Sequence, residues 1–218
     1  MKRFEKKYSY SPIYNEFLHS QILALGFIEV FEKRIVSSIY YDDDKFSLYQ
    51  ESIDGLGNRN KFRIRFYNQD TNNLTLEKKI RINDYGMKEF KEIKNDLIPL
   101  EIYDSYFSKK SSIKIPMNIL NIYKPVIITK YERSYFSLSN DSESRITLDK
   151  NIRFGSVYLT GIDSLKVNIN IPFENNIMEV KSNFNNEFLS GSIIKELNYF
   201  YLQNERSSKY CNAIESLY

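Results

Sequence analysis

The chain has 218 residues and a mass of 26.0 kDa, which is enough for one domain with a substantial core. A net charge of +3 argues against binding nucleic acid or a membrane surface through one broad basic face, and a single cysteine and a single histidine leave no thiol pair or histidine cluster for a metal. Residues 1–7 are charged with no apolar signal core, and no run approaches the ~20 apolar residues of a membrane span, so we expect a cytoplasmic protein.

The first half of the chain predicts one helix and several strands. Residues 2–9 alternate in character as a strand does. Ser11 and Pro12 suit the N-cap and first residue of a helix whose apolar positions continue to Leu25, and Gly26 suits the residue just past its end. Residues 35–41 are rich in β-branched and aromatic side chains and predict a strand. Residues 61–67 and 74–82 predict a hairpin across a polar connection.

The second half begins with a helical region and then returns to strands. Pro99 and Pro116 are predicted helix starts within residues 96–122. Further strands are predicted at residues 126–136, 145–149, 166–171 and 177–181, and a last helix between Phe188 and Tyr201. Because there is no internal repeat and no low-complexity linker, we expect one domain over residues 1–218.

Six of the predicted strands have one apolar face and one charged face. Side chains at positions i and i+2 share a face of a strand. The charged faces are Arg3 with Glu5 and Lys7, Lys61 with Arg63 and Arg65, Glu77 with Lys79 and Arg81, Tyr131 with Arg133, Arg145 with Thr147 and Asp149, and Glu179 with Lys181.

Any one of these strands could belong to a sheet with a solvated face. The whole set favours a closed barrel with its charges turned inward, because solvated faces usually also carry Thr, Ser, Gln and Asn. Like charges crowded inside a barrel repel one another, since two unit charges ~4 Å apart interact by about 4 kcal/mol at an effective dielectric near 20. A bound polyanion would offset this repulsion. The pattern therefore predicts an α+β fold with a charged β-barrel interior that binds a chain of phosphates.

An ordered set of motifs resembles the VTC domain (vacuolar transporter chaperone), the polyphosphate polymerase branch of the triphosphate tunnel enzymes. The motifs are Arg3-Phe4-Glu5-Lys6-Lys7-Tyr8, Ser38-Ile39-Tyr40-Tyr41-Asp42, Arg59-Asn60-Lys61-Phe62-Arg63-Ile64-Arg65-Phe66-Tyr67, Leu76-Glu77-Lys78-Lys79, Tyr131-Glu132-Arg133, Arg145-Ile146-Thr147-Leu148-Asp149, Glu179-Val180-Lys181 and Ser207-Ser208-Lys209-Tyr210. Each motif alone is weak, but their order over nearly the whole chain is fairly specific.

The resemblance implies an eight-stranded antiparallel tunnel flanked by helices, and a metal-dependent transfer of the γ-phosphate of ATP to a growing polyphosphate chain. It implies catalytic roles for Arg63, Arg65, Arg133, Arg145 and Glu179, and substrate contacts from Lys7, Lys61, Lys79, Lys88, Tyr131, Lys181 and Lys209. Glu179 would be the principal ligand of Mn²⁺ or Mg²⁺, with Glu5 and Glu77 nearby as ligands or ion-pair partners. Expected partners are ATP and polyphosphate or pyrophosphate, with no nucleic acid and no direct membrane insertion; a membrane partner stays open, as does the oligomeric state.

Two other functions compete with the polymerase. One is hydrolysis of tripolyphosphate or a nucleoside triphosphate, and the other is binding of polyphosphate without catalysis. Tunnel triphosphatases begin with Glu-x-Glu-x-Lys, whereas Arg3 stands at the first Glu position here. The lost carboxylate favours the polymerase over the hydrolase.

Overall fold

The computed structural model describes residues 3–68, 70, 72–83, 85–91, 97–139, 141–161, 164–183, 202–204 and 208–218. The strands are β1 (Arg3–Tyr10), β2 (Phe27–Asp42), β3 (Asn58–Tyr67), β4 (Thr75–Ile82), β5 (Tyr85–Lys91), β6 (Leu97–Asp104), β7 (Lys109–Pro116), β8 (Lys124–Leu138), β9 (Asp141–Leu159), β10 (Leu165–Ile169), β11 (Ile171–Pro172), β12 (Asn176–Asn183) and β13 (Gln203–Asn204). The helices are η1 (Pro12–Tyr14), α1 (Asn15–Ala24), α2 (Ser47–Ile53) and α4 (Lys209–Leu217). None of these helices is long and apolar enough to cross a lipid bilayer.

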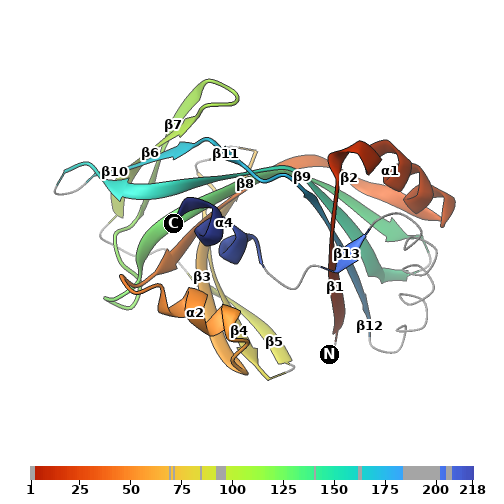
Figure 1. Ribbon diagram of the computed structural model, residues 1–218, viewed down its shortest axis with the longest axis horizontal. Helices are drawn as coiled ribbons and strands as arrows, with labels where there is room; N and C mark the ends of the chain where they lie inside the picture. The colour runs from red at the N-terminus through yellow and green to blue at the C-terminus, as the bar shows by residue number, and fades with distance from the viewer. Residues whose placement is uncertain are drawn as a thin grey trace. The chain divides into compact units, whose positions relative to one another are not determined.

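The chain forms two compact units, and strands β2, β8 and β9 contribute residues to both. The first unit contains Met1–Arg34, Tyr131–Ile152 and Phe173–Arg206. Within it β1 lies between β13 and β12, as Figure 1 shows, and it pairs with β12 along its whole length. One face of this sheet and helix α1 bury a core that includes Tyr10, Leu18 and Ile146.

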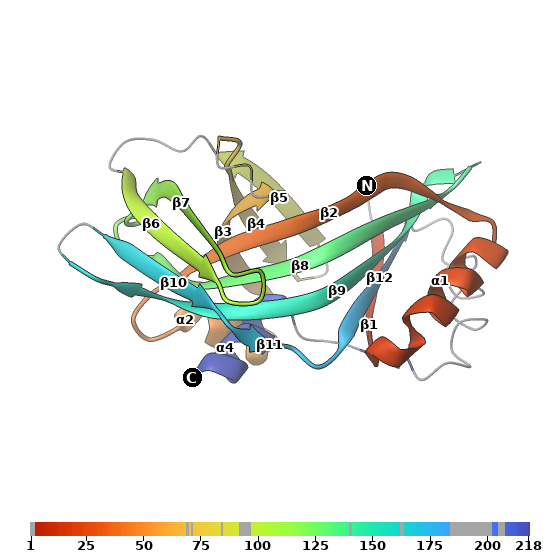
Figure 2. The same ribbon diagram turned by 90° about the horizontal axis from the view of Figure 1, so that it is seen from above.

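The second unit contains Ile35–Lys130, Arg153–Pro172 and Ser207–Tyr218. Its strands follow the order β9-β8-β2-β3-β4-β5, while β7 pairs with β6, and β6 pairs with β10 (Figure 2). Helix α2 contacts both β3 and helix α4 (Figure 1). The apolar faces of β2 and β3 pack with those of β6, β7 and β10, so Ile39, Ile64 and Leu100 are buried in one core.

Most of the predicted elements are confirmed. Helix α1 follows Pro12, and Gly26 has a φ of 84°, a conformation that favours glycine at the end of a helix. The predicted strands at 35–41, 61–67, 126–136, 145–149 and 177–181 lie within observed strands, and those at 74–82 and 166–171 each differ from the observed strands by one residue. The helix predicted between Phe188 and Tyr201 lies outside the described residues.

Two predictions are wrong. Pro99 and Pro116 do not begin helices; they lie in the antiparallel hairpin of β6 and β7, where alternate residues from Leu100 to Asp104 are buried at the period of a strand. The eight-stranded antiparallel barrel is also wrong in detail. The observed sheet has thirteen strands and mixed pairing, because β10 runs parallel to β6, and within the described ranges no pairing joins its end strands β13 and β5.

Candidate functional site

The second unit carries a basic row on one face of β3. Lys61, Arg63 and Arg65 alternate with Phe62 and Ile64, whose side chains are buried in the core. Arg65 is itself buried and donates from Nε to the Ser38 hydroxyl of β2, at 3.1 Å. Strand alternation therefore sorts the basic and apolar side chains as the sequence predicts.

Glu77 of β4 is the counter-ion of this row. It lies opposite Arg63, which donates to its Oε2 atom, and Lys88 of β5 approaches the same oxygen at 3.9 Å. Burial alone would raise the pKa of Glu77, but Arg63, Arg65 and Lys88 outweigh it and lower this pKa. One carboxylate thus faces several cations, because Lys79 and Lys88 also lie side by side on β4 and β5. The excess positive charge suits phosphate groups.

Helix α4 brings its first turn to the same face. The Lys61 ammonium donates to the Ser208 hydroxyl at 2.8 Å, and Ser208 caps the helix by accepting from the Cys211 amide. Lys209 is the first residue of α4 and is half-buried. Ser208, the residue before Lys209, therefore joins the start of α4 to the Lys61 row.

Two members of this face were missed by the sequence analysis. Ser38 lies opposite Arg65 and Tyr40 lies opposite Arg63 in the pairing of β2 with β3. The available signal was the same alternation, because Ser38 and Tyr40 stand two residues apart within a predicted strand.

The first unit holds a second cluster, centred on Glu179 of β12. Glu179 lies opposite Lys7 of β1, and Lys181 lies opposite Glu5. The Lys181 ammonium is 3.4 Å from Glu179 and 3.9 Å from Glu5. Burial alone would raise the pKa of the Glu179 carboxyl. A hydrogen bond with Glu5 and the surrounding cations outweigh burial and hold this pKa well below its usual range.

Arg133 of β8 belongs to the same cluster. It forms a bidentate pair with Asp149 of β9, at 2.5 and 2.7 Å, lies 3.9 Å from Glu179, and covers the ring of Tyr131. Burial opposes the charge on Arg133, but Asp149 above all raises its pKa well above the usual value. Arg145 is exposed and lies opposite Lys181 in the register of β9 with β12. Asp149 is therefore an ion-pair partner that holds Arg133 in place.

The carboxylates of the first unit fit a divalent cation. Glu5 and Glu179 both lie near the Lys181 ammonium, at 3.9 and 3.4 Å, and a cation between two such carboxylates relieves their mutual repulsion. The described part of the chain contains no group of three or more His, Cys, Asp or Glu side chains that could hold a metal. Mg²⁺ commonly binds one or two carboxylates together with substrate phosphates, so Glu5 and Glu179 are the residues that could hold it. Glu77 instead lies in the second unit, as the partner of Arg63.

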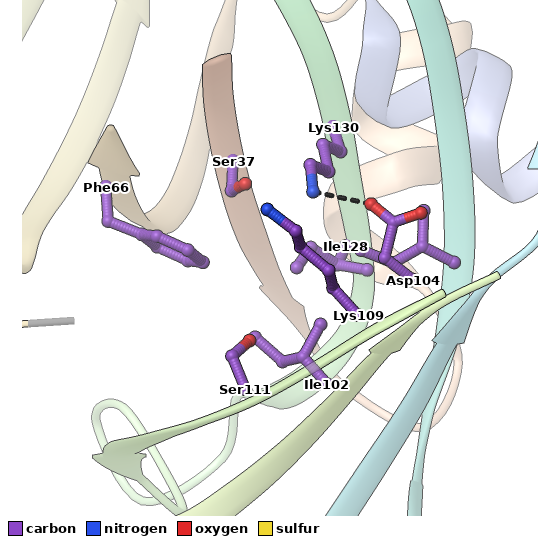
Figure 3. A pocket seen from close by; sticks show the side chains of 9 residues that line it. Ser37, Phe66, Ile102, Asp104, Lys109, Ser111, Ile128 and Lys130 are labelled. Carbon is purple, nitrogen blue, oxygen red and sulfur yellow. Dashed lines mark hydrogen bonds and ion pairs between the residues drawn. The ribbon is translucent and has the colours of Figure 1, made fainter. Parts of the chain in front are cut away.

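A small pocket of the second unit lies apart from these faces. Figure 3 shows Lys130 and Asp104 joined by an ion pair there, with Phe66 and Ile128 among the lining residues. Asp104 also accepts from the backbone amides of Tyr106 and Phe107. These bonds tie the turn between β6 and β7 to the core, which is a structural role.

The chain matches one protein family over nearly its whole length, and individual relatives over about half of it. The VTC domain profile matches residues 2–218. Vacuolar transporter chaperone complex subunit 4 of Schizosaccharomyces pombe is 28% identical over 148 residues, which are 56% of this chain and 20% of that protein. Subunit 2 of the same complex from Saccharomyces cerevisiae is 26% identical over 151 residues, 55% of this chain and 18% of that protein. The matches thus cover only about a fifth of each yeast protein.

Two solved structures share the fold. A Hippeastrum protein, described as an adenylyl cyclase candidate with a dominant triphosphatase activity, has a TM-score of 0.51 and 11% identity, with 99% of this chain and 96% of that chain covered. A Vibrio parahaemolyticus protein described as an adenylate cyclase candidate has a TM-score of 0.50 and 14% identity, covering 99% and 98%. At these identities the likeness concerns the fold alone.

Proposed function

Because the chain belongs to the VTC domain family, we propose that it is a metal-dependent phosphotransferase that adds the γ-phosphate of ATP to a polyphosphate chain and releases ADP. The observation that best supports this proposal is the cluster around Glu179. There an acidic pair, Glu5 and Glu179, lies among Lys7, Lys181 and Arg133. A site that binds both a divalent cation and phosphate needs this mixture of charges.

The protein's own residues would bind and align phosphates. Arg63, Arg65, Arg133 and Arg145 present guanidinium groups that can hold phosphate oxygens in pairs, while Lys7, Lys61, Lys79, Lys88, Lys181 and Lys209 supply single positive charges and Tyr131 a hydroxyl. No nucleophilic side chain is required, because the attacking oxygen belongs to the terminal phosphate of the growing chain. Phosphoryl transfer of this kind depends mainly on position and charge neutralisation.

Glu179 and Glu5 would hold the metal, Mn²⁺ or Mg²⁺. A cation bound there with the phosphates would neutralise charge that develops on their oxygens. Lys7 and Lys181 would orient these carboxylates, because each lies opposite one of them across the strands, and both cations help to hold the pKa of Glu179 low. Arg133 is held by Asp149 on one side and remains within 3.9 Å of Glu179 on the other.

Hydrolysis of tripolyphosphate or a nucleoside triphosphate is the second candidate. The triphosphatase activity described for the Hippeastrum protein of the same fold favours it. Both reactions use the same cations and metal, and they differ only in whether water or a phosphate chain attacks.

The test is to incubate the purified chain with ATP and Mn²⁺ or Mg²⁺, and to follow ADP, free phosphate and polyphosphate together. Loss of activity in Glu179→Gln, but not in Glu132→Gln, would assign the reaction to the proposed site. Glu132 is a matched control in the same unit, since it pairs with Lys33 and Asn151 and not with the cluster. ADP formed in equal amount to the phosphate added to polyphosphate supports the polymerase, and ADP formed in equal amount to free phosphate supports the hydrolase. If polyphosphate binds but no ADP forms, the chain is a binding module.

A further inference from the structure

Tyr40 has its hydroxyl among the cations of the β3 row. It is a buried residue of β2, lies directly opposite Arg63, and its oxygen accepts a hydrogen bond from Arg63 Nη1 at 3.3 Å. Ser38, two residues earlier on the same face, likewise accepts from Arg65. The two side chains of β2 therefore present oxygens to the two arginines of β3.

The ring of Tyr40 is held from the other side by helix α4. It stacks on Tyr210, with ring centroids 5.1 Å apart and planes inclined by 24°. The Tyr210 hydroxyl in turn donates to Asp42, a carboxylate that also accepts from the Leu48 and Tyr49 amides at the start of α2. The position of the Tyr40 hydroxyl is consequently fixed by α2, α4 and β3 together.

The charges that face Tyr40 are mostly positive. Lys61, Arg63 and Arg65 come from β3, while the carboxylate of β4, Glu77, is engaged by Arg63. On the α4 side the neighbour is the neutral phenol of Tyr210, whose pKa burial and Asp42 raise. Burial opposes ionisation of Tyr40, but Arg63, Arg65 and Lys61 lower its pKa to about 8. In the absence of phosphate, the three cations thus favour a negative oxygen at this position.

We propose that the Tyr40 hydroxyl is a further phosphate ligand, and that polyphosphate binding is coupled to uptake of a proton by Tyr40. This inference rests on the proposed function, because it assigns phosphate to the Lys61, Arg63 and Arg65 row. A phosphate chain on that row neutralises the cations and repels a phenolate. The phenolate takes a proton from the solvent, and the resulting O–H donates to a phosphate oxygen while its oxygen still accepts from Arg63.

The coupling has a defined sign. Phosphate raises the pKa of Tyr40, so binding is favoured below the pKa of the free protein and weakens as the pH rises through about 8. Over that range the affinity falls by up to about tenfold per pH unit. Below pH 7 the phenol is already protonated, and this contribution disappears.

The test is metal-free calorimetry with tripolyphosphate as the probe, at pH 6.5 and pH 9, in two buffers that differ in ionisation enthalpy. The number of protons taken up is compared between the wild-type chain and Tyr40→Phe, which keeps the ring that stacks on Tyr210. At pH 9 we expect the wild type to take up more protons than the variant by an amount approaching one, and at pH 6.5 we expect the two to agree. Protons bound by the probe itself cancel in this comparison.

Tyr41→Phe is the matched control, because Tyr41 lies on the opposite face of β2 and donates its hydroxyl to the Pro116 carbonyl. It should take up protons as the wild type does. If Tyr40→Phe weakens binding equally at both pH values with unchanged proton uptake, Tyr40 only positions Arg63 and the inference is overturned. If the wild type fails to bind tripolyphosphate at all, the proposed function is overturned with it, so the two failures are distinct.

Discussion

Arg63 and Glu77 lie directly opposite each other on β3 and β4, and the Arg63 guanidinium donates from both Nε and Nη2 to one oxygen of Glu77, at 2.7 and 2.5 Å. Both side chains are largely buried, so neither can replace its partner with bulk water. A carboxylate is thus built into a face that otherwise attracts anions.

The first prediction concerns removal of this carboxylate. Glu77→Gln should lower the free energy of unfolding by about 3 kcal/mol, because it leaves Arg63 with an uncompensated buried charge. Tripolyphosphate should restore more stability to the variant than to the wild type, since it supplies the missing negative charge. Urea denaturation with and without tripolyphosphate measures both effects, and equal stabilisation of the two proteins would contradict the assignment of phosphate to this face.

The pH dependence of the same pair gives a second prediction. The pKa of Glu77 is lower in the folded chain than in the unfolded one. Its contribution to the free energy of unfolding is therefore complete above the pKa of the unfolded state and is lost as the pH falls through the pKa of the folded state. The stability difference between the wild type and Glu77→Gln should therefore be constant near pH 7 and shrink below about pH 4.3. Denaturation curves between pH 3 and pH 7 test this, and a difference that grows toward low pH would be inconsistent with it.

Substitution of Arg145 should lower activity without lowering stability. Its side chain is exposed, so Arg145→Ala should change the free energy of unfolding by no more than about 0.5 kcal/mol. If Arg145 holds a transferring phosphate, the rate should nevertheless fall on the order of 10²–10³-fold. Initial rates with ATP measure the loss, and Lys114→Ala, an exposed position of β7, is the control that should keep full activity.

We expect substitutions of Glu5 and of Glu179 to change the metal requirement of the reaction in different ways. Glu5→Gln removes one of two carboxylates, so the Mn²⁺ concentration needed for half-maximal activity should rise on the order of 10–100-fold while the rate at saturation is largely kept. Glu179→Gln should not be rescued by added metal, and a chelator should abolish wild-type activity. A metal titration of the three proteins decides the matter, and an unchanged requirement in Glu5→Gln would remove Glu5 from the ligand set.

The ion pair of Lys130 with Asp104 should affect stability alone. Both groups are buried, and Lys130→Met leaves Asp104 without its partner, which should cost about 3 kcal/mol of unfolding free energy. Lys130→Met combined with Asp104→Asn should recover part of this loss. Catalytic rates of the folded variants should match the wild type, whereas a large rate loss would connect the pocket of Figure 3 with catalysis.

Which side chains share a face of a strand could be predicted from the sequence alone. Lys61, Arg63 and Arg65 were predicted to lie together, and so were Glu179 and Lys181, because alternation along a strand is a local property of the backbone. The sequence also indicated the family, because the family's motifs occur along the chain in their usual order. The preference of proline for the start of a helix is another local rule, and it gave the wrong prediction at Pro99 and Pro116, because the alternating burial of the β6 and β7 hairpin outweighs it.

Which of these faces meet depends on the tertiary structure. Lys7 lies opposite Glu179 and Arg63 opposite Glu77 through strand registers, and Tyr40 stacks on Tyr210 although 170 residues of sequence separate them. Register depends on turns and on packing of the whole sheet, and a slip of one residue would move each charge to the other face. For that reason candidate site residues could be proposed from the sequence, whereas the counter-ion of each cation and the place of Tyr40 could not.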